Sequence, residues 1–173
     1  MSMQIPMPFA RPLLMAALPA MALATACTAM ADDVSGSVDG EARQWHVLQG
    51  DDGKTVNFSE FSPGFQTVTI QAHRSTRYEV EGSISITFSL MDGEISDGEA
   101  MYFPEARMTP HFTDENAHER LVLERVELDG GDTRLVGRYE GELAYRGSMF
   151  SEADETNTVS LVVEFDVSPS RED

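Results

Sequence analysis

Hydrophobic and polar residues alternate along most of the chain between residues 34 and 167. A period of two predicts β-strands, because successive side chains of a strand point to opposite faces of a sheet. The two clearest runs cover residues 78–90 and 134–146. Five weaker runs cover residues 34–38, 43–48, 55–58, 66–72 and 159–167.

Asp-Gly pairs lie between several of these runs. Such pairs are typical of tight hairpin turns, because both residues tolerate positive φ. The predicted turns are Asp39-Gly40, Asp52-Gly53, Asp92-Gly93, Asp97-Gly98 and Asp129-Gly130-Gly131-Asp132. Runs and turns together predict an all-β fold, either an antiparallel β-sandwich or a small closed barrel of about eight or nine strands.

Two glycines interrupt the longest run. Gly137 and Gly141 fall on the same face as Tyr139. A glycine inside a strand marks a bend or a close approach to the backbone. We favour curvature of the sheet over a ligand pressed against this face.

Residues 113–128 allow a helix or a hairpin. The apolar residues before the Asp-Gly turn at 129–130 favour a hairpin, with a bulge near Glu124-Arg125. We expect at most one turn of helix near residues 114–118.

The first 31 residues have the composition of a secretory signal peptide. They contain no acidic residue, and an apolar stretch from residue 13 to residue 26 follows Arg11. Ala29 and Ala31 supply the small side chains that a signal peptidase reads, so we predict cleavage after Ala31. A single domain, residues 32–173, would then remain in the periplasm or outside the cell.

The segment 23–27, Leu-Ala-Thr-Ala-Cys, resembles a bacterial lipobox. In that motif the cysteine is lipidated and becomes the new N-terminus. The leucine of this chain lies one residue farther from Cys27 than the motif requires. Cleavage after Ala31 is therefore favoured, and an outer-membrane lipoprotein anchored through Cys27 is the alternative. Contact with a membrane is expected only in that case.

Charge and cysteine content exclude several classes of function. The formal net charge is −18, from 30 acidic and 12 basic residues. A broad negative surface repels DNA, RNA and anionic lipid, so no nucleic-acid partner is expected. One cysteine cannot form an internal disulfide or a multi-cysteine zinc site. We expect the partner to be a protein or a small molecule.

The sequence contains no nucleophile elbow, phosphate-binding loop or His-Glu-x-x-His motif. His111 and His118 lie close in sequence to Asp114, Glu115 and Glu119, and a metal-dependent hydrolase could be built from them. The spacing matches no established ligand pattern, so enzymatic activity is an alternative that we do not favour.

The acidic repeat Asp-Gly-Glu occurs twice within residues 92–99. Asp92, Glu94, Asp97 and Glu99 are predicted to share one loop. Because Ca²⁺ takes oxygen ligands from flexible loops, Ca²⁺ is the cofactor that this cluster would bind.

Residues 91–118 carry several apolar side chains without sustained alternation, which predicts a long functional loop. Tyr102, Phe103, Met108 and Phe112 are the candidate binding residues of this loop. They either form an exposed recognition patch or fold back to cover an open end of the sandwich. The usual burial of apolar side chains favours the second arrangement.

These observations predict an exported acidic β-domain that binds or interacts rather than catalyses, in the bacterial periplasm or envelope. A lipid-anchored structural protein of the envelope and the metal-dependent hydrolase are the two alternatives.

Overall fold

The computed structural model describes residues 32–50, 53–129 and 132–172, which form thirteen strands and one short 3-10 helix, η1. No helix in this part of the chain is long and apolar enough to cross a membrane. The elements are β1 (Asp33–Val38), β2 (Glu41–Trp45), β3 (Gln49–Gly50), β4 (Gly53–Lys54), β5 (Val56–Ser62), β6 (Phe65–Ala72), β7 (Ser83–Met91), β8 (Glu94–Phe103), β9 (His111–Asp114), η1 (Ala117–Glu119), β10 (Leu121–Glu127), β11 (Arg134–Arg146), β12 (Asp154–Val167) and β13 (Ser170–Arg171).

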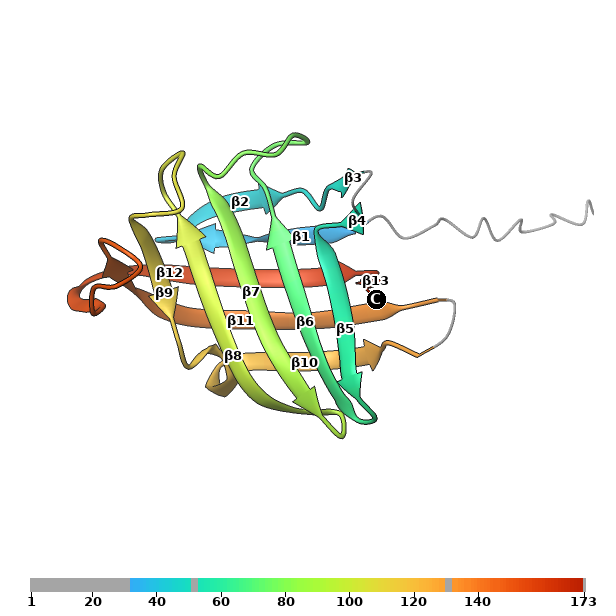
Figure 1. The fold of residues 1–173 in the computed structure, drawn as a ribbon. Helices are drawn as coiled ribbons and strands as arrows, with labels where there is room; N and C mark the ends of the chain where they lie inside the picture. The colour runs from blue at the N-terminus through green and yellow to red at the C-terminus, as the bar shows by residue number, and fades with distance from the viewer. Residues whose placement is uncertain (1–31, 51–52, 130–131, 173) are drawn as a thin grey trace, which may run out of the picture.

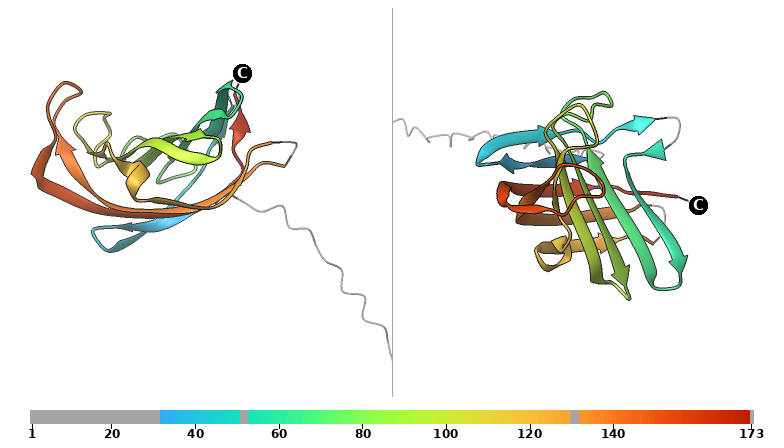
Figure 2. Two further views of the ribbon diagram at one scale, coloured as in Figure 1. Left: turned by 90° about the horizontal axis from the view of Figure 1, so that it is seen from below. Right: turned by 60° about the vertical axis from the view of Figure 1, so that its left-hand side comes forward.

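The predicted all-β class is confirmed, and eleven of the strands belong to one large sheet. The path through this sheet is β13-β5-β6-β7-β8-β9-β11-β12-β1-β2, and β10 pairs with β11 beside β9. All neighbours are antiparallel except β13 and β5. The sheet folds over itself, so that β5–β8 lie in front of β10–β12, β1 and β2 (Figures 1 and 2). Strand β9 joins the two layers, because it pairs with both β8 and β11.

Two details of the predicted architecture are wrong. The count of eight or nine strands is too low, because the segment predicted to be a long loop contains β8 and β9. The sheet is also not a closed barrel, since its end strands β13 and β2 do not pair with each other.

The predicted core rows are confirmed in β7 and β11. Ile84, Ile86, Phe88 and Leu90 of β7 are at most 1% exposed, and Leu135, Tyr139 and Leu143 of β11 are fully buried. The run predicted to begin at residue 78 instead begins at Ser83. Residues 78–82 form a loop and turn, and Gly82 has a φ of +73° that does not fit a strand.

Two of the Asp-Gly turns are hairpin turns as predicted. Asp39 and Gly40 have φ of +49° and +77°, and Asp92 and Gly93 have φ of +51° and +85°. The predicted turn at Asp97-Gly98 is wrong, because both residues lie inside β8. The register of β7 and β8 shifts between Ser89 and Leu90, and this bulge masks the alternation of β8 in the sequence.

The space above the two glycines of β11 is filled by aromatic rings of the same chain. A Cβ at Gly141 would lie 2.3 Å from the hydroxyl oxygen of Tyr139, and one at Gly137 would lie 2.7 Å from the Phe165 ring. The Val122 backbone oxygen also lies 2.6 Å from the Gly137 Cβ position. A side chain at either glycine would therefore collide with neighbouring atoms of the same chain, so the glycines allow close packing on this face of the strand.

Within residues 113–128, the predicted hairpin with the run 134–146 is confirmed from Leu121 onward. Strand β10 pairs with β11, and the register shifts between Leu123 and Arg125, where the sequence predicted a bulge. The helical content before β10 is limited to η1, as expected.

Candidate functional site

A buried polar network joins β9, η1 and β11. Asp114 is 8% exposed, and its Oδ2 accepts hydrogen bonds from the Tyr139 hydroxyl and from Arg120, both at 2.8 Å. Its Oδ1 accepts a bond from the Asn116 backbone N–H at 3.0 Å. Burial, and then the bond to Asp114, raises the pKa of Tyr139, so the phenol stays protonated. Both oxygens of Asp114 accept hydrogen bonds, and this network therefore ties β9, β11 and the residues that flank η1 together.

The four candidate binding residues of the apolar segment do not form one surface. Tyr102 and Phe103 are neighbours on β8, so their side chains point to opposite faces of the sheet. Phe103 is buried on its own face. Tyr102 and Phe112 pair across β8 and β9, and they pack against the core at the end of the sheet. Met108 is 53% exposed on the connecting loop. The pair of rings covers the end of the core, which agrees with the second predicted arrangement.

The two candidate metal-binding histidines lie on different elements, β9 and η1. The ring of His111 is buried against Phe103, with ring centroids 5.8 Å apart. No group of three or more His, Cys, Asp or Glu side chains in residues 32–50, 53–129 and 132–172 is placed to hold a metal ion. The hydrolase alternative therefore gains no support from this part of the chain.

Burial lowers the pKa of His111, partly offset by its hydrogen bond to the Met108 backbone. Arg146 lowers that pKa further, and Glu99 raises it. The folded chain therefore resists protonation, whereas unfolded chains take up the proton near pH 6.5. The free energy of unfolding should fall as the pH decreases through that value.

We expect His111→Gln to remove this part of the pH dependence. The test is the melting temperature of both chains at pH 8 and pH 5.5. At pH 8, the difference in melting temperature between the unmodified chain and His111→Gln reflects packing alone. At pH 5.5 the unmodified chain should lose more stability than the variant, so the difference should shift in favour of the variant. Parallel pH profiles would contradict the assignment to His111.

The four acidic residues proposed for Ca²⁺ do not share a flexible loop. Asp92 lies in the β7–β8 turn, whereas Glu94, Asp97 and Glu99 lie on β8. The Gly98 backbone N–H donates to Asp97 at 2.8 Å, and the Thr113 hydroxyl donates to Glu99 at 2.9 Å. The prediction that these four residues share one loop is wrong. Calcium binding itself stays a prediction.

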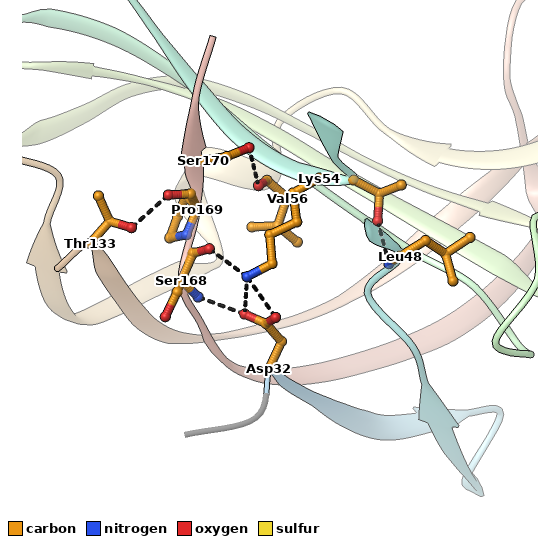
Figure 3. Close-up of polar contacts among 9 residues, drawn as sticks. Asp32, Leu48, Lys54, Val56, Thr133, Ser168, Pro169 and Ser170 are labelled. Atoms are coloured by element: carbon orange, nitrogen blue, oxygen red, sulfur yellow. Dashed lines mark hydrogen bonds and ion pairs between the residues drawn. The ribbon is translucent and has the colours of Figure 1, made fainter. Parts of the chain in front are cut away.

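The processing residues Cys27, Ala29 and Ala31 lie outside the described residues, which begin at Asp32. The Asp32 carboxylate pairs with Lys54 at 2.6 Å and accepts a bond from the Ser168 backbone N–H at 2.8 Å. Lys54 also donates to the Ser168 carbonyl at 2.8 Å (Figure 3). We call Asp32, Lys54 and Ser168 the terminal clasp, because they join the start of β1, the arm β3–β4 and the end of β12.

Beside the terminal clasp lies a groove of about 640 Å³ that the sequence analysis missed. Two segments that are distant in sequence form its walls. The lining residues are His46, Val47, Leu48, Gln49, Gly50, Thr55, Thr76, Arg77 and Tyr78.

The first wall of the groove is fixed by backbone contacts. Leu48 and Thr55 are joined by two hydrogen bonds of 2.9 Å, one to the Thr55 hydroxyl and one between backbones. His46 and His73 exchange backbone bonds of 2.7 and 2.9 Å, which hold the end of β2 against the end of β6.

The second wall is the loop 74–82, which covers the fully buried ring of His73. The His73 Nδ1 atom lies 2.8 Å from the Glu79 carbonyl oxygen, and the Tyr78 ring lies 5.0 Å from the His73 ring. Tyr78 nevertheless keeps 64% of its surface exposed. None of the ion pairs among the described residues includes its neighbour Arg77.

Comparison with known protein families, characterised proteins and solved structures finds no match to this chain.

Proposed function

We propose that the chain is an exported, acidic, non-enzymatic binding module of the bacterial periplasm or envelope, and that the groove beside Tyr78 is its ligand site. The observation that carries this proposal is the character of the groove. An apolar cavity with a few polar groups is the usual form of a small-molecule site.

The lining of the groove indicates the class of ligand. Val47, Leu48 and the exposed Tyr78 ring provide apolar contact, and Arg77 adds a positive charge at the rim. Arg77 is the local cation that would attract an anionic group, against the long-range repulsion from a formal charge of −18. The groove therefore suits a ligand with an apolar or aromatic body and one negative group.

The compartment is part of the same proposal. Asp32 is the first residue after the predicted cleavage point and belongs to the terminal clasp, so cleavage after Ala31 leaves the clasp complete. The full chain is expressed in a bacterial host, and the intact mass is measured in soluble and membrane fractions. A soluble chain that begins at Asp32 supports the proposal, and a membrane-bound chain with acylated Cys27 means that the lipid-anchored alternative is correct.

The ligand site is tested with 8-anilinonaphthalene-1-sulfonate, which combines aromatic rings with a sulfonate. Trp45 is the single tryptophan and precedes His46, so energy transfer from Trp45 to the bound dye reports occupancy of the groove. We expect Tyr78→Ala to weaken binding about tenfold, because exposed aromatic residues dominate such sites. Arg77→Gln should weaken it by about threefold to tenfold.

Phe150→Ala is the matched control, because Phe150 is fully exposed in the β11–β12 turn. That turn lies at the opposite end of the molecule from β3 and β4 (Figure 1). The dye affinity of Phe150→Ala should equal that of the unmodified chain. If Phe150→Ala weakens binding and Tyr78→Ala does not, the groove is not the site.

A further inference from the structure

The outward faces of the two layers differ in chemistry. The outward positions of β11 and β12 include six charged residues, namely Arg134, Arg138, Glu140, Glu142, Glu164 and Asp166. The outward positions in the middle of β5, β6 and β7 carry no charge. We call these residues the hydroxyl face: Asn57, Ser59, Thr67, Thr69, Gln71, Ser85, Thr87 and Ser89.

The register of the strands aligns most of these side chains in two rows that continue onto β8. The rows are Asn57–Thr69–Thr87–Glu99 and Ser59–Thr67–Ser89–Asp97. Neighbours within a row are about 4.8 Å apart, and the rows are about 6.8 Å apart. Each row therefore presents uncharged polar groups followed by one carboxylate.

A depression of about 320 Å³ lies where the two rows end. Its lining includes the row residues Thr87, Ser89, Asp97 and Glu99. Hydroxyl groups there can donate and accept hydrogen bonds, and the carboxylates accept them. This arrangement suits a ligand that presents several hydroxyl groups.

Exposed apolar side chains border the hydroxyl face at the hairpin tips. Phe61 sits on the bulge of β5, is 70% exposed and has its ring centroid 6.0 Å from that of Phe65. Phe65 pairs with Met91, which is 54% exposed. Phe61, Phe65 and Met91 each lie two residues along their strand from a residue of the hydroxyl face, so they extend that outward face toward the hairpin tips.

We propose that the hydroxyl face, together with Phe61, binds a neutral polysaccharide. Removing uncharged hydroxyl groups from water costs less than removing charges, and Ser and Thr lose little side-chain entropy. Carboxylates make strong hydrogen bonds to sugar hydroxyl groups, and an aromatic ring packs against the C–H face of a sugar.

Charge and access favour this partner over an acidic one. A formal charge of −18 repels acidic polymers and a second copy of the chain, but it does not repel a neutral glycan. The outward side of β5–β8 is also open, since no described element crosses the middle of this layer (Figure 1). The surface is separate from the groove, so either proposal can fail without the other.

The test is retention of the purified protein on microcrystalline cellulose, chitin and curdlan, together with its retardation by hydroxyethylcellulose in native gels. We expect binding to at least one of these neutral polysaccharides. Because the partner is uncharged, binding should not change between 50 and 500 mM NaCl, whereas an electrostatic contact would weaken. If the protein binds none of the four polysaccharides, or if its binding falls markedly as the salt concentration rises, the proposal is overturned.

Paired variants locate the surface. Thr69→Lys places a charge in the middle of the hydroxyl face, and Ser160→Lys places the same charge on the outward side of β12. Phe61→Ser and Phe150→Ser each remove an exposed ring whose loss does not threaten the core. We expect Thr69→Lys and Phe61→Ser to weaken binding about tenfold, and the two controls to have no effect. Equal effects within either pair would exclude this face.

Discussion

Gly36→Ala is expected to prevent β1 from pairing with β12, and it should be the most damaging Gly→Ala substitution among the described residues. A Cβ at residue 36 would lie 1.9 Å from the Val162 carbonyl oxygen and 2.7 Å from the carbonyl carbon. Both atoms belong to the backbone of β12, and they cannot rotate away as a side chain would. The strand itself must shift.

The position of β1 makes such a shift costly. Strand β1 pairs with β12 on one side and with β2 on the other, and Gly36 lies in the middle of both pairings. A displaced β1 would also move Val34 and Trp45, which are at most 2% exposed in the core. We expect a loss of about 4 kcal/mol or more in the free energy of unfolding, or a chain that does not fold.

Gly40→Ala is the matched control, because it adds the same methyl group in the adjoining turn. Nothing lies within 4 Å of a Cβ at Gly40, so the expected cost is the strain of its positive φ, about 1–2 kcal/mol. Both variants are compared by urea denaturation followed by circular dichroism. Similar losses for the two would mean that β1 and β12 can separate freely.

The sequence predicted those parts of the fold in which one strand has one buried face. In β7 and β11 every second side chain enters the core, and the period of two is directly visible. The Asp-Gly turns at 39–40 and 92–93 were predicted correctly because their positive φ depends on local chemistry alone. These features need no knowledge of the partner strand.

The missed elements depend on contacts between segments that are distant in sequence. Strand β9 has only four residues, and it is defined by its pairing with β8 and β11 rather than by its own pattern. Residues 46–50 and 76–78 form one groove because β2 ends beside β6. An Arg-Tyr pair in a loop is a weak signal by itself, and only the fold shows what lies opposite.

The composition of a segment does not determine the direction of its side chains. Tyr102 and Phe103 are aromatic neighbours in the sequence, yet adjacent residues of a strand face opposite sides. The acidic residues 94–99 are likewise close in sequence but extend along β8. Both errors follow from treating a bulged strand as a loop.

Lys54→Met should be the second largest of the predicted effects, because it breaks the terminal clasp. The side chains of Lys54 and Asp32 are 16% and 19% exposed, so the pair is mostly removed from water. Without Lys54, the Asp32 carboxylate loses its counter-charge and the Ser168 carbonyl loses a donor. Breaking a fully buried pair costs about 3–5 kcal/mol, and the partial exposure here reduces the expected loss to about 2–3 kcal/mol.

Arg138→Met is the control for loss of one positive charge with a similar apolar replacement. Arg138 pairs with Glu140 and Glu164, but these side chains are 47%, 61% and 66% exposed. Exposed pairs contribute little, so its free energy of unfolding should change by about 0.5 kcal/mol or less. Equal losses for the two variants would mean that the clasp acts as an ordinary surface pair.

The double variant Asp32→Asn with Lys54→Met distinguishes an unpaired charge from a lost contact. The Asp32→Asn side chain retains an oxygen that can accept the Ser168 N–H bond but carries no charge, so the double variant should be more stable than Lys54→Met alone. The clasp also fixes the arm whose next residue, Thr55, lines the groove. Lys54→Met should therefore weaken dye binding, whereas Arg138→Met should not. If Lys54→Met lowers stability but leaves dye affinity unchanged, the clasp joins the start of β1 to the end of β12 without positioning the groove.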